Sequence, residues 1–206
     1  MGFVDTLNNS LRKIPTWLVY IVATLWVGWL FYLGAATNQL GPDPIETLEH
    51  SYGELALKLL VLGLAVTPLR NWTGVNLMRF RRAIGVTAFF VVLAHFSVWA
   101  LLDVKSWDRI WVDVVKRPYV TIGMLSLLLL VPLAVTSNNL SLRKVGALRW
   151  RKLHKLVYPA AFLAALHYVW LVKGFQIEPI VYLTLIAGLI LVRGLPKRTR
   201  RISTRA

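Results

Sequence analysis

"WRKLHKLVYPAAFLAALHY", residues Trp150 to Tyr168, places two histidines thirteen residues apart, His154 and His167, in a run that is apolar after Tyr158. An imidazole inside an apolar helix costs free energy unless it is hydrogen-bonded or bound to another group. At 1.5 Å per residue the two side chains lie ~20 Å apart along the helix axis. The stretch therefore predicts a membrane-buried helix that presents imidazoles at two depths.

The composition is that of a membrane protein. Hydrophobic residues make up 57% of the 206 residues, against roughly 45–50% in soluble domains. In a soluble protein a net charge of +15 would suggest a nucleic-acid partner, but here the basic residues lie between and beyond apolar segments, so we expect no nucleic-acid binding. The chain has no cysteine, which excludes disulfides, thiolate metal sites and iron–sulfur clusters and leaves histidine as the main candidate metal ligand.

Six segments are apolar and long enough, or nearly so, to cross a lipid bilayer, which takes about 20 residues. They are Pro15–Ala36, Tyr52–Leu69, Phe80–Leu102, Pro118–Thr136, Arg151–Val172 and Gln176–Val192. The predicted fold is an all-α, polytopic membrane helical bundle with six transmembrane helices, in one domain that covers residues 1–206 with short basic tails. Between the third and fourth segments, "DVKSWDRIWVDVVKR" (residues 103–117) is apolar at every third or fourth position, which predicts a short helix on the membrane surface.

The basic residues indicate which ends of the bundle face the cytoplasm. Eighteen of the 24 Lys and Arg residues lie in the N-terminal tail, in the loops after the second and fourth segments with the segment ends that flank them, and in the C-terminal tail with the flanking Arg193. Five lie in the other three loops, and Lys58 lies inside the second segment. Basic loops stay in the cytoplasm, so both termini are predicted to be cytoplasmic. The C-terminal "LPKRTRRISTRA" is expected to be solvated, as a topology signal or as a contact for anionic lipid head groups.

A third histidine forms a candidate ligand pair with His167. His95 lies seven residues before the outer end of the third segment, and His167 lies five residues before the outer end of the fifth. Two histidines on different helices at one depth are what a haem iron needs at its two axial positions, whereas tetrahedral zinc would need further ligands. The alternative is that each histidine hydrogen-bonds a neighbouring helix, with Ser97 and Thr121 as candidate partners. His50, in the predicted outer loop, is expected to be solvated.

His154 is predicted to lie near the cytoplasmic boundary. A spacing of thirteen residues is about 3.6 turns, so His154 and His167 point ~140° apart on a straight helix. Pro159, between them, is predicted to kink the helix and alter that angle. The spacing alone does not decide between one haem and two.

Four stretches of the chain carry a resemblance to a known family. They are "LAVTPLRNWTG" (64–74), "RFRRAIGVTAFFVVLAHF" (79–96), "KRPYVTIGMLSLLLLVPLAVTSN" (116–138) and "WRKLHKLVYPAAFLAALHYVWLVKG" (150–174). In this order they resemble the ferric-reductase-like transmembrane family, and within it the haem-binding membrane subunits of methionine sulfoxide reductase systems. The resemblance covers roughly Gly53 to Gly174.

The resemblance implies a b-type haem held by transmembrane histidines, here His95, His154 and His167. It also implies a periplasmic, molybdenum-containing partner subunit that reduces methionine sulfoxide in proteins, and a place in the bacterial inner membrane. Electrons would come from the quinone pool or from a flavin reductase, with FMN as a further cofactor. Composition and spacing alone indicate none of these partners.

The chain departs from the dihaem members of the wider family, which carry two histidines on each of two helices. Its third segment has only His95, and the positions 13 and 14 residues earlier are Arg82 and Arg81. A guanidinium stays protonated and is a poor iron ligand, but it binds a haem propionate well. We therefore predict one haem between His95 and His167, leave a second haem on His154 open, and predict that Arg81 and Arg82 bind a cofactor. Topology signalling is the alternative role for these arginines.

The predicted function is that of a haem-carrying electron-transfer subunit, not of a complete enzyme. One alternative is a stand-alone ferric or oxygen reductase core that works with a separate flavoprotein, because no stretch of the chain resembles the flavin and nicotinamide domains of full ferric reductases. Another is a transporter whose histidines relay protons, which the scarcity of acidic residues within the spans disfavours.

Overall fold

The computed structural model describes residues 2–37, 39–172 and 174–194, and every regular element in these ranges is helical. The predicted all-α fold class is confirmed. The predicted basic tail, residues 195–206, lies outside the described residues. The α-helices are α1 Phe3–Lys13, α2 Trp17–Ala36, α3 Pro44–Thr73, α4 Arg81–Ser97, α5 Trp107–Lys116, α6 Pro118–Val135, α7 Asn139–Val145, α8 Ala147–Leu153, α9 Val157–Leu171 and α10 Ile177–Gly194.

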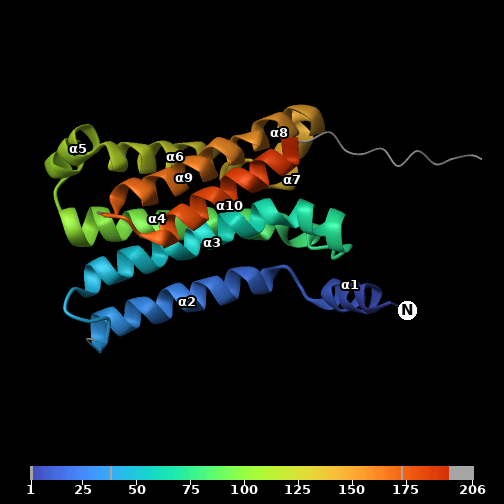
Figure 1. The fold of residues 1–206 in the computed structure, drawn as a ribbon, viewed down its shortest axis with the longest axis horizontal. Helices are drawn as coiled ribbons and strands as arrows, with labels where there is room; N and C mark the ends of the chain where they lie inside the picture. Colours follow the sequence, from blue (N-terminus) through green and yellow to red (C-terminus); the bar gives the residue numbers. More distant parts are fainter. Residues whose placement is uncertain (1, 38, 173, 195–206) are drawn as a thin grey trace, which may run out of the picture.

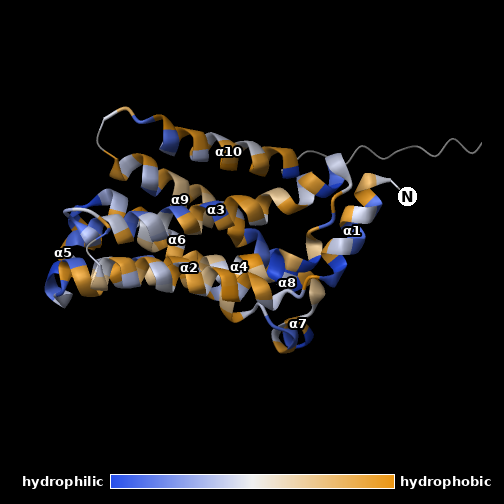
Figure 2. Ribbon diagram, turned by 90° about the horizontal axis from the view of Figure 1, so that it is seen from below, coloured by the Kyte–Doolittle hydropathy of each residue, from blue (hydrophilic) through white to orange (hydrophobic). Residues whose placement is uncertain are grey.

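The long helices α2, α3, α4, α6, α9 and α10 run side by side along the long axis of the molecule (Figure 1). The surface helix predicted from the charged stretch is present as α5 and lies at one end of the bundle. Helices α1, α7 and α8 and the end of α10 gather at the opposite end. Orange, apolar residues dominate the long helices and blue, hydrophilic ones gather at the two ends (Figure 2), as expected of a bundle that spans a bilayer.

Within the described residues, four helical stretches are long and apolar enough to cross a membrane. They are Trp17–Ala36, Pro44–Thr73, Met78–Val104 and Pro118–Val135. The chain is therefore a multi-pass membrane protein. The fifth and sixth predicted spans correspond to α9 and α10, which have 15 and 18 residues. The count of six spans and the cytoplasmic position of the termini stay predictions.

Helix α3, which corresponds to the second predicted segment, begins eight residues earlier than that segment, at Pro44 instead of Tyr52. The side chain of Asp43 caps it by accepting a hydrogen bond from the backbone N–H of Glu46 at 3.1 Å, and proline suits the first helical position because its missing N–H would have no helical partner there. His50 therefore lies on α3, not in a loop, although its side chain is exposed as expected.

The helix in the opening stretch is interrupted where a kink was predicted. α8 ends at Leu153, residues His154–Leu156 form a 3₁₀ turn, and α9 begins at Val157. Pro159 explains the interruption, because proline has no N–H to donate and its ring crowds the carbonyl four residues earlier. The turn separates the segment that carries His154 from the segment that carries His167.

The core lies between α3, α4, α6, α9 and α10. Small residues on α9 are fully buried there: Ala160, Ala161 and Ala165. They allow α6 to approach closely, and the hydroxyl of Ser126 on α6 donates to the carbonyl of Ala160 at 2.9 Å. α2 buries no residue and lies at the edge of the bundle against α3 and α4, so α3, α4, α6 and α9 form the inner scaffold that positions the site.

Candidate functional site

His95 on α4 and His167 on α9 face each other inside the bundle. Their ring centroids lie 6.3 Å apart, and the ring planes meet at 75°. This confirms the prediction that the two histidines lie at one depth. Residues 72 positions apart in the chain are therefore brought together by the packing of α4 and α9 on α6.

Each ring is oriented by a backbone carbonyl on a neighbouring helix. Nδ1 of His95 lies 2.9 Å from the carbonyl oxygen of Glu49 on α3, and Nδ1 of His167 lies 2.7 Å from that of Tyr119 on α6. A carbonyl only accepts, so each Nδ1 carries the proton and donates it. Each Nε2 then keeps its lone pair, which is the state in which a histidine binds a metal while its other nitrogen donates to a carbonyl.

The hydroxyls that were candidate partners for the histidines are used elsewhere. Ser97 donates to the carbonyl of Leu93 at 2.8 Å, and Thr121 donates to the carbonyl of Val114. The alternative in which each histidine hydrogen-bonds a neighbouring helix is therefore seen in the structure, but the partners are the backbone carbonyls of Glu49 and Tyr119 and not these hydroxyls. The true partners were missed because every residue has a backbone carbonyl, so nothing in the sequence distinguishes those of Glu49 and Tyr119.

Two glycines let the rings lie against α3 and α6. A Cβ on Gly53 would lie 3.3 Å from Nδ1 and Cε1 of His95, and a Cβ on Gly123 would lie 3.0 Å from Nδ1 of His167. Contacts this short force the neighbouring group to move. Gly53 and Gly123 are therefore part of the site, although the sequence pattern did not indicate this role.

A cavity of about 1030 Å³, counting the space at its open side, surrounds the histidine pair. Its walls come from α3, α4, α6 and α9. Its apolar lining includes Ala56, Leu57, Leu60, Val92, Phe96, Trp99, Val120, Met124, Leu127, Ala164 and Leu171, and its polar lining includes Glu49, His50, Glu54, Tyr119, Ser126 and Tyr168. A large apolar cavity with a few convergent polar groups is the usual form of a cofactor site.

Within the described residues, no group of three or more His, Cys, Asp or Glu side chains is placed to hold a metal ion. A bare ion would find only two imidazoles here. The pair therefore suits a metal whose remaining positions are filled by a cofactor's own donor atoms. Such a group can take up and release one electron at a time within the membrane.

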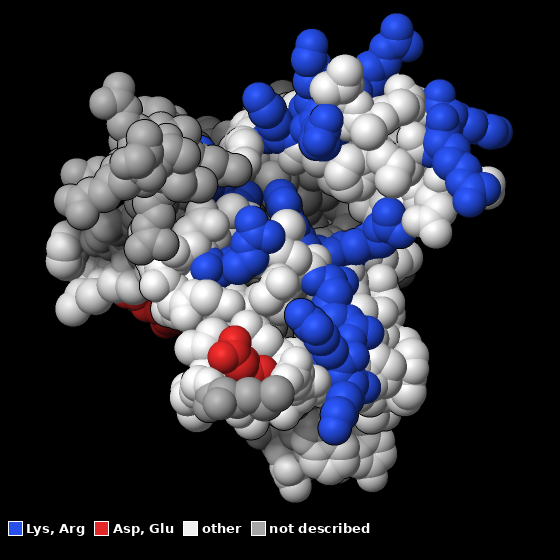
Figure 3. Space-filling model, turned by 90° about the vertical axis from the view of Figure 1, so that its right-hand side faces the viewer, with Lys and Arg blue, Asp and Glu red and all other residues white. Residues whose placement is uncertain are grey.

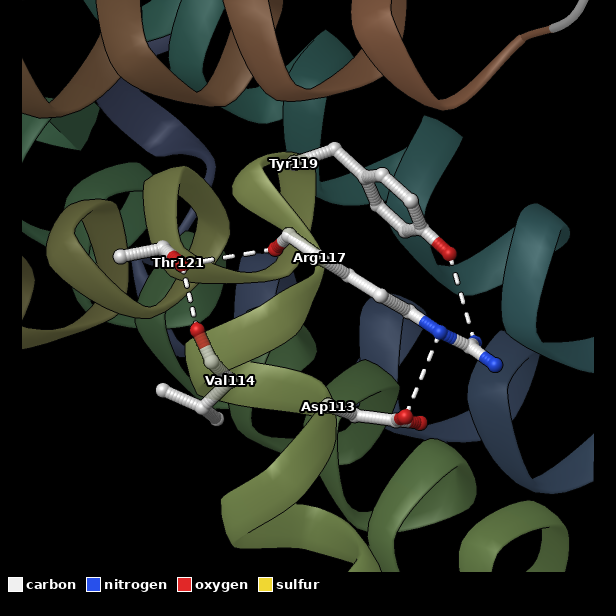
Figure 4. Close-up of polar contacts among 5 residues, drawn as sticks. All are labelled: Asp113, Val114, Arg117, Tyr119 and Thr121. Atoms are coloured by element: carbon white, nitrogen blue, oxygen red, sulfur yellow. Dashed lines mark hydrogen bonds and ion pairs between the residues drawn. The ribbon is translucent and has the colours of Figure 1, made fainter.

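The corner between α5 and α6 lies next to the Tyr119 carbonyl that accepts from His167, and Figure 4 shows the polar contacts of this corner. Arg117 forms an ion pair with Asp113 at 3.2 Å and donates to the hydroxyl of Tyr119 at 3.4 Å. The Thr121 hydroxyl bonds the carbonyl of Val114 at the end of α5. These contacts fix the first turn of α6, whose Tyr119 carbonyl accepts from His167.

His154 is not brought together with another histidine. It lies in the 3₁₀ turn, where its ring stacks on Trp150 at a centroid distance of 3.7 Å and its Nδ1 bonds the carbonyl of Trp150 at 3.0 Å. Its Nε2 lies 3.4 Å from the hydroxyl of Ser137. The Trp150 indole is itself anchored to the carbonyl of Thr136 at 2.8 Å.

The predicted arginines lie at the same end of the bundle as His154. Arg82 donates to the side-chain oxygen of Asn139 on α7 at 2.8 Å, whereas Arg81 lies near Tyr158 and Arg193, and its charge is close enough to act on His154. Lys and Arg side chains crowd this face and surround a hollow at its centre (Figure 3).

Comparisons with known proteins agree with this geometry. A family model described as "Ferric reductase like transmembrane component" matches residues 52–165. The chain belongs to the ferric-reductase-like transmembrane family. Within this family, it is 49% identical over 178 residues to proteins named "Protein-methionine-sulfoxide reductase heme-binding subunit MsrQ" from Brucella ovis and Brucella canis, a match that covers 86% of this chain and 80% of theirs. The resemblance stated from the sequence is confirmed.

Proposed function

We propose that this member of the family binds b-type haem between His95 and His167 and carries electrons across the membrane as the haem-binding subunit of a methionine sulfoxide reductase system. The names of the relatives from Brucella support this function. The single observation that carries it is the facing pair of imidazoles, each with its Nδ1 committed to a carbonyl.

The residues fit the group. Metal–imidazole bonds are about 2 Å long, so one metal bound by two rings sets their centroids roughly 6 Å apart; the observed separation is 6.3 Å. The donor set is two neutral imidazoles, as haem iron takes at both axial positions in bis-histidine proteins. The apolar walls of the cavity suit a large planar macrocycle.

When bound, haem supplies reversible one-electron chemistry. The chain's own residues do the rest. The carbonyls of Glu49 and Tyr119 fix the orientation of the two rings and raise the basicity of their Nε2 atoms. The buried side chains of Leu57, Leu60 and Leu127 help to keep water from the cavity, which lowers the local dielectric constant and so contributes to the reduction potential.

At the basic end we propose that Arg81 and Arg82 bind an anionic group of a cofactor, either a haem propionate or the phosphate of FMN. Arg82 is already oriented by Asn139, and the position of Arg81 near Arg193 concentrates positive charge there. His154 is the candidate ligand of a second haem. Ser137 and Trp150 are the neighbours it would have to accommodate.

The crowding of Lys and Arg at one end supports a cytoplasmic position for that end (Figure 3). We place the chain in the bacterial inner membrane as a single domain of residues 1–206, with six spans and both termini in the cytoplasm. The electron donor would be the quinone pool or a flavin reductase. The acceptor would be a periplasmic, molybdenum-containing catalytic subunit that reduces methionine sulfoxide in proteins.

Absorption spectroscopy of the purified full-length protein tests the haem assignment. We expect a Soret band, and an α-band that sharpens on reduction with dithionite. Acid–acetone should extract the pigment, because there is no cysteine for a covalent link. A colourless protein purified from haem-sufficient cells would refute the proposal.

Co-purification tests the partner. Recovery of a periplasmic molybdoenzyme with the tagged chain, and reduction of that enzyme through the chain, are the expected results. Reduction of ferric complexes or oxygen at the outer face without any partner would favour the alternative, a stand-alone reductase core that works with a separate flavoprotein.

A further inference from the structure

The helix that carries His95 does not end as an ordinary α-helix. After Ser97 the chain continues as a π-helical segment, Val98–Val104, in which the amide of Lys105 donates to the carbonyl of Ala100, five residues earlier, at 3.1 Å. Lys105 then adopts a left-handed backbone conformation, with φ of 59°, which is uncommon for a residue other than glycine. Turns of π-helix within α-helices often occur at functional sites. We therefore ask what the side chains of this segment do.

Three consecutive residues of the segment are buried: Val98, Trp99 and Ala100. Successive side chains of a helix are turned by about 100°, so three buried neighbours must face more than one packed surface. Val98 packs with residues of α3, whereas Trp99 and Ala100 pack with Val120 on α6. The segment is therefore wedged between α3 and α6, one turn beyond His95.

Trp99 forms part of the wall of the cavity around the histidine pair. It lines this cavity, and its indole ring lies 5.8 Å from the ring of Phe96, which lines the cavity as well. Ile110 and Val114 of α5 pack against the cluster of Trp99, Ala100 and Val120. None of the described residues that line the cavity belongs to α5. The wall made by Trp99 therefore lies between the cavity and α5, which covers this end of the bundle (Figure 1).

The cavity is open on a different side. Among the described residues that line it, His50 on α3 is the exposed one and so marks the mouth. Trp99 and Val120 are each only 8% exposed, although they line the same cavity. The wall beside α5 is therefore a closed side of the cavity.

A place in the interfacial belt does not explain Trp99. Tryptophans near the ends of spans usually lie at the boundary between lipid and water, and Trp170 on α9, three residues after His167, has this pattern with 56% of its surface exposed. The indole of Trp99 is instead turned inward and buried. Its contacts are with the cavity and with α6.

We propose that Trp99 seals the histidine site toward the α5 end of the bundle, so that water reaches the site only through the mouth beside His50. This role rests on the proposed function, because a seal matters to a redox group held between His95 and His167. Water beside such a group stabilises its more highly charged, oxidised form. A closed wall therefore raises the reduction potential of the site.

Thiol labelling tests the seal and needs no bound cofactor. The chain has no cysteine, so an introduced thiol is the one reactive site for a charged methanethiosulfonate reagent. Val120→Cys places a thiol in the wall, and His50→Cys places one at the mouth. In the full-length protein in detergent we expect fast labelling at position 50 and slow labelling at position 120. Adding Trp99→Ala should accelerate labelling at position 120 by at least about tenfold, because thiol reactivity follows exposure, and leave position 50 unchanged.

Two further variants make the comparison specific to the Trp99 ring. Trp170→Ala removes an indole near the same ligand pair but outside the wall, and should leave labelling at position 120 slow. Trp99→Phe keeps an aromatic ring in the wall and should restore slow labelling. If Trp99→Ala fails to fold, Trp99→Leu decides, because it keeps an apolar side chain and still leaves part of the wall open.

Equal labelling of position 120 with Trp99 and with its Ala or Leu replacement would overturn the proposal. Labelling of position 120 as fast as position 50 in the presence of Trp99 would also overturn it, because the wall would then already admit water.

The reduction potential supplies a second readout. Trp99→Ala should lower the potential in spectroelectrochemical titration, and Trp99→Phe should return it to the wild-type value. A loss of stability alone would reduce haem content without this pattern, and an unchanged potential in Trp99→Ala would contradict the seal. A wild type without haem refutes the proposed function, whereas the labelling rates are measured in either case and decide the seal by themselves.

Discussion

Gly123 lies so close to His167 that a Cβ at position 123 would come within 3.0 Å of Nδ1 of the ring. That nitrogen donates the hydrogen bond to Tyr119, one turn earlier on the same helix as Gly123, at 2.7 Å. The absence of a side chain at residue 123 therefore sets how closely the ring approaches α6. It also sets the strength of the bond that fixes the orientation of the ring.

Gly123→Ala should weaken haem binding without unfolding the bundle. The added methyl displaces the His167 ring by a few tenths of an ångström and lengthens the bond to Tyr119. Changes to a ligand's outer partner typically lower metal affinity by roughly tenfold or more. We expect a lower haem-to-protein ratio and, because Nε2 becomes less basic, a higher reduction potential, measured by spectroelectrochemical titration.

Gly85→Ala is the matched control. Gly85 lies on α4, the helix that carries His95, and a Cβ there would meet nothing within 4 Å. We expect normal haem content and an unchanged potential. Equal haem loss in Gly85→Ala and Gly123→Ala would show that any added methyl disturbs the bundle, and the specific role of Gly123 would be abandoned.

Alanine substitutions of His95, His154 and His167 should have different effects on haem binding. His167→Ala and His95→Ala each remove one of the two facing imidazoles, so we expect lost or five-coordinate haem and no electron delivery to a periplasmic acceptor. His154→Ala should leave the spectrum of that site largely intact, because His154 precedes His167 by thirteen residues and so lies ~20 Å away by helix rise, toward the basic end of the bundle. Haem-to-protein ratios and low-spin spectra of the single variants are the measurement.

A low-spin spectrum that persists in His95→Ala would mean that the pairing is wrong. Complete haem loss in His154→Ala would also count against it, provided that circular dichroism shows a folded bundle. Arg81→Ala tests the basic end separately, and a spectral change there with His95 still ligated would favour a second haem or a flavin.

The sequence predicted the apolar helices and the depth of the histidine pair because both depend on periodicity and on the rise of a helix. His95 and His167 were identified as partners from their distances to the ends of their segments alone. The start of α3 was placed at Tyr52 because the preceding residues are polar, whereas the Asp43 cap and Pro44 extend the helix into the loop. Helices α1 and α7 are short and polar and were not predicted.

The supporting contacts of the site could not be predicted in the same way. Gly53 and Gly123 matter only because particular rings pack on them, and the carbonyls of Glu49 and Tyr119 look like any others in the chain. Such contacts depend on how helices far apart in the sequence are rotated against each other. Periodicity within one helix carries no information about that rotation.

Tyr119→Phe should keep the haem site, because His167 uses the backbone carbonyl of residue 119 and not its phenol. The hydroxyl of Tyr119 contacts only Arg117, at 3.4 Å, among the contacts shown in Figure 4. We expect unchanged haem content and potential.

Thr121→Val removes the hydroxyl that bonds the carbonyl of Val114 and so connects α6 to α5. The substitution should lower the free energy of unfolding by about 1 kcal/mol, measured as a lower Tm in detergent.

A Tyr119→Phe variant with altered haem bands would show that the phenol contributes to the site. A Thr121→Val variant as stable as the wild type would show that the bond to Val114 does not hold the corner. Both outcomes are read from the same absorption and melting curves, so one preparation of each variant is sufficient.

The last prediction concerns where the electron acceptor docks. Asp103 and Asp108 are exposed at the end of the bundle that carries α5, the end nearest the histidine pair and opposite the basic face. An acceptor with a basic patch would be steered to them at low ionic strength. The double variant Asp103→Lys with Asp108→Lys should therefore slow electron delivery by about tenfold or more at low salt, with normal haem content, and the difference should shrink as salt screens the charges. Asp5→Lys, a charge reversal at the opposite end on α1, is the control and should deliver electrons at the wild-type rate. If the double variant is as fast as the control at low ionic strength, the acceptor docks on another surface.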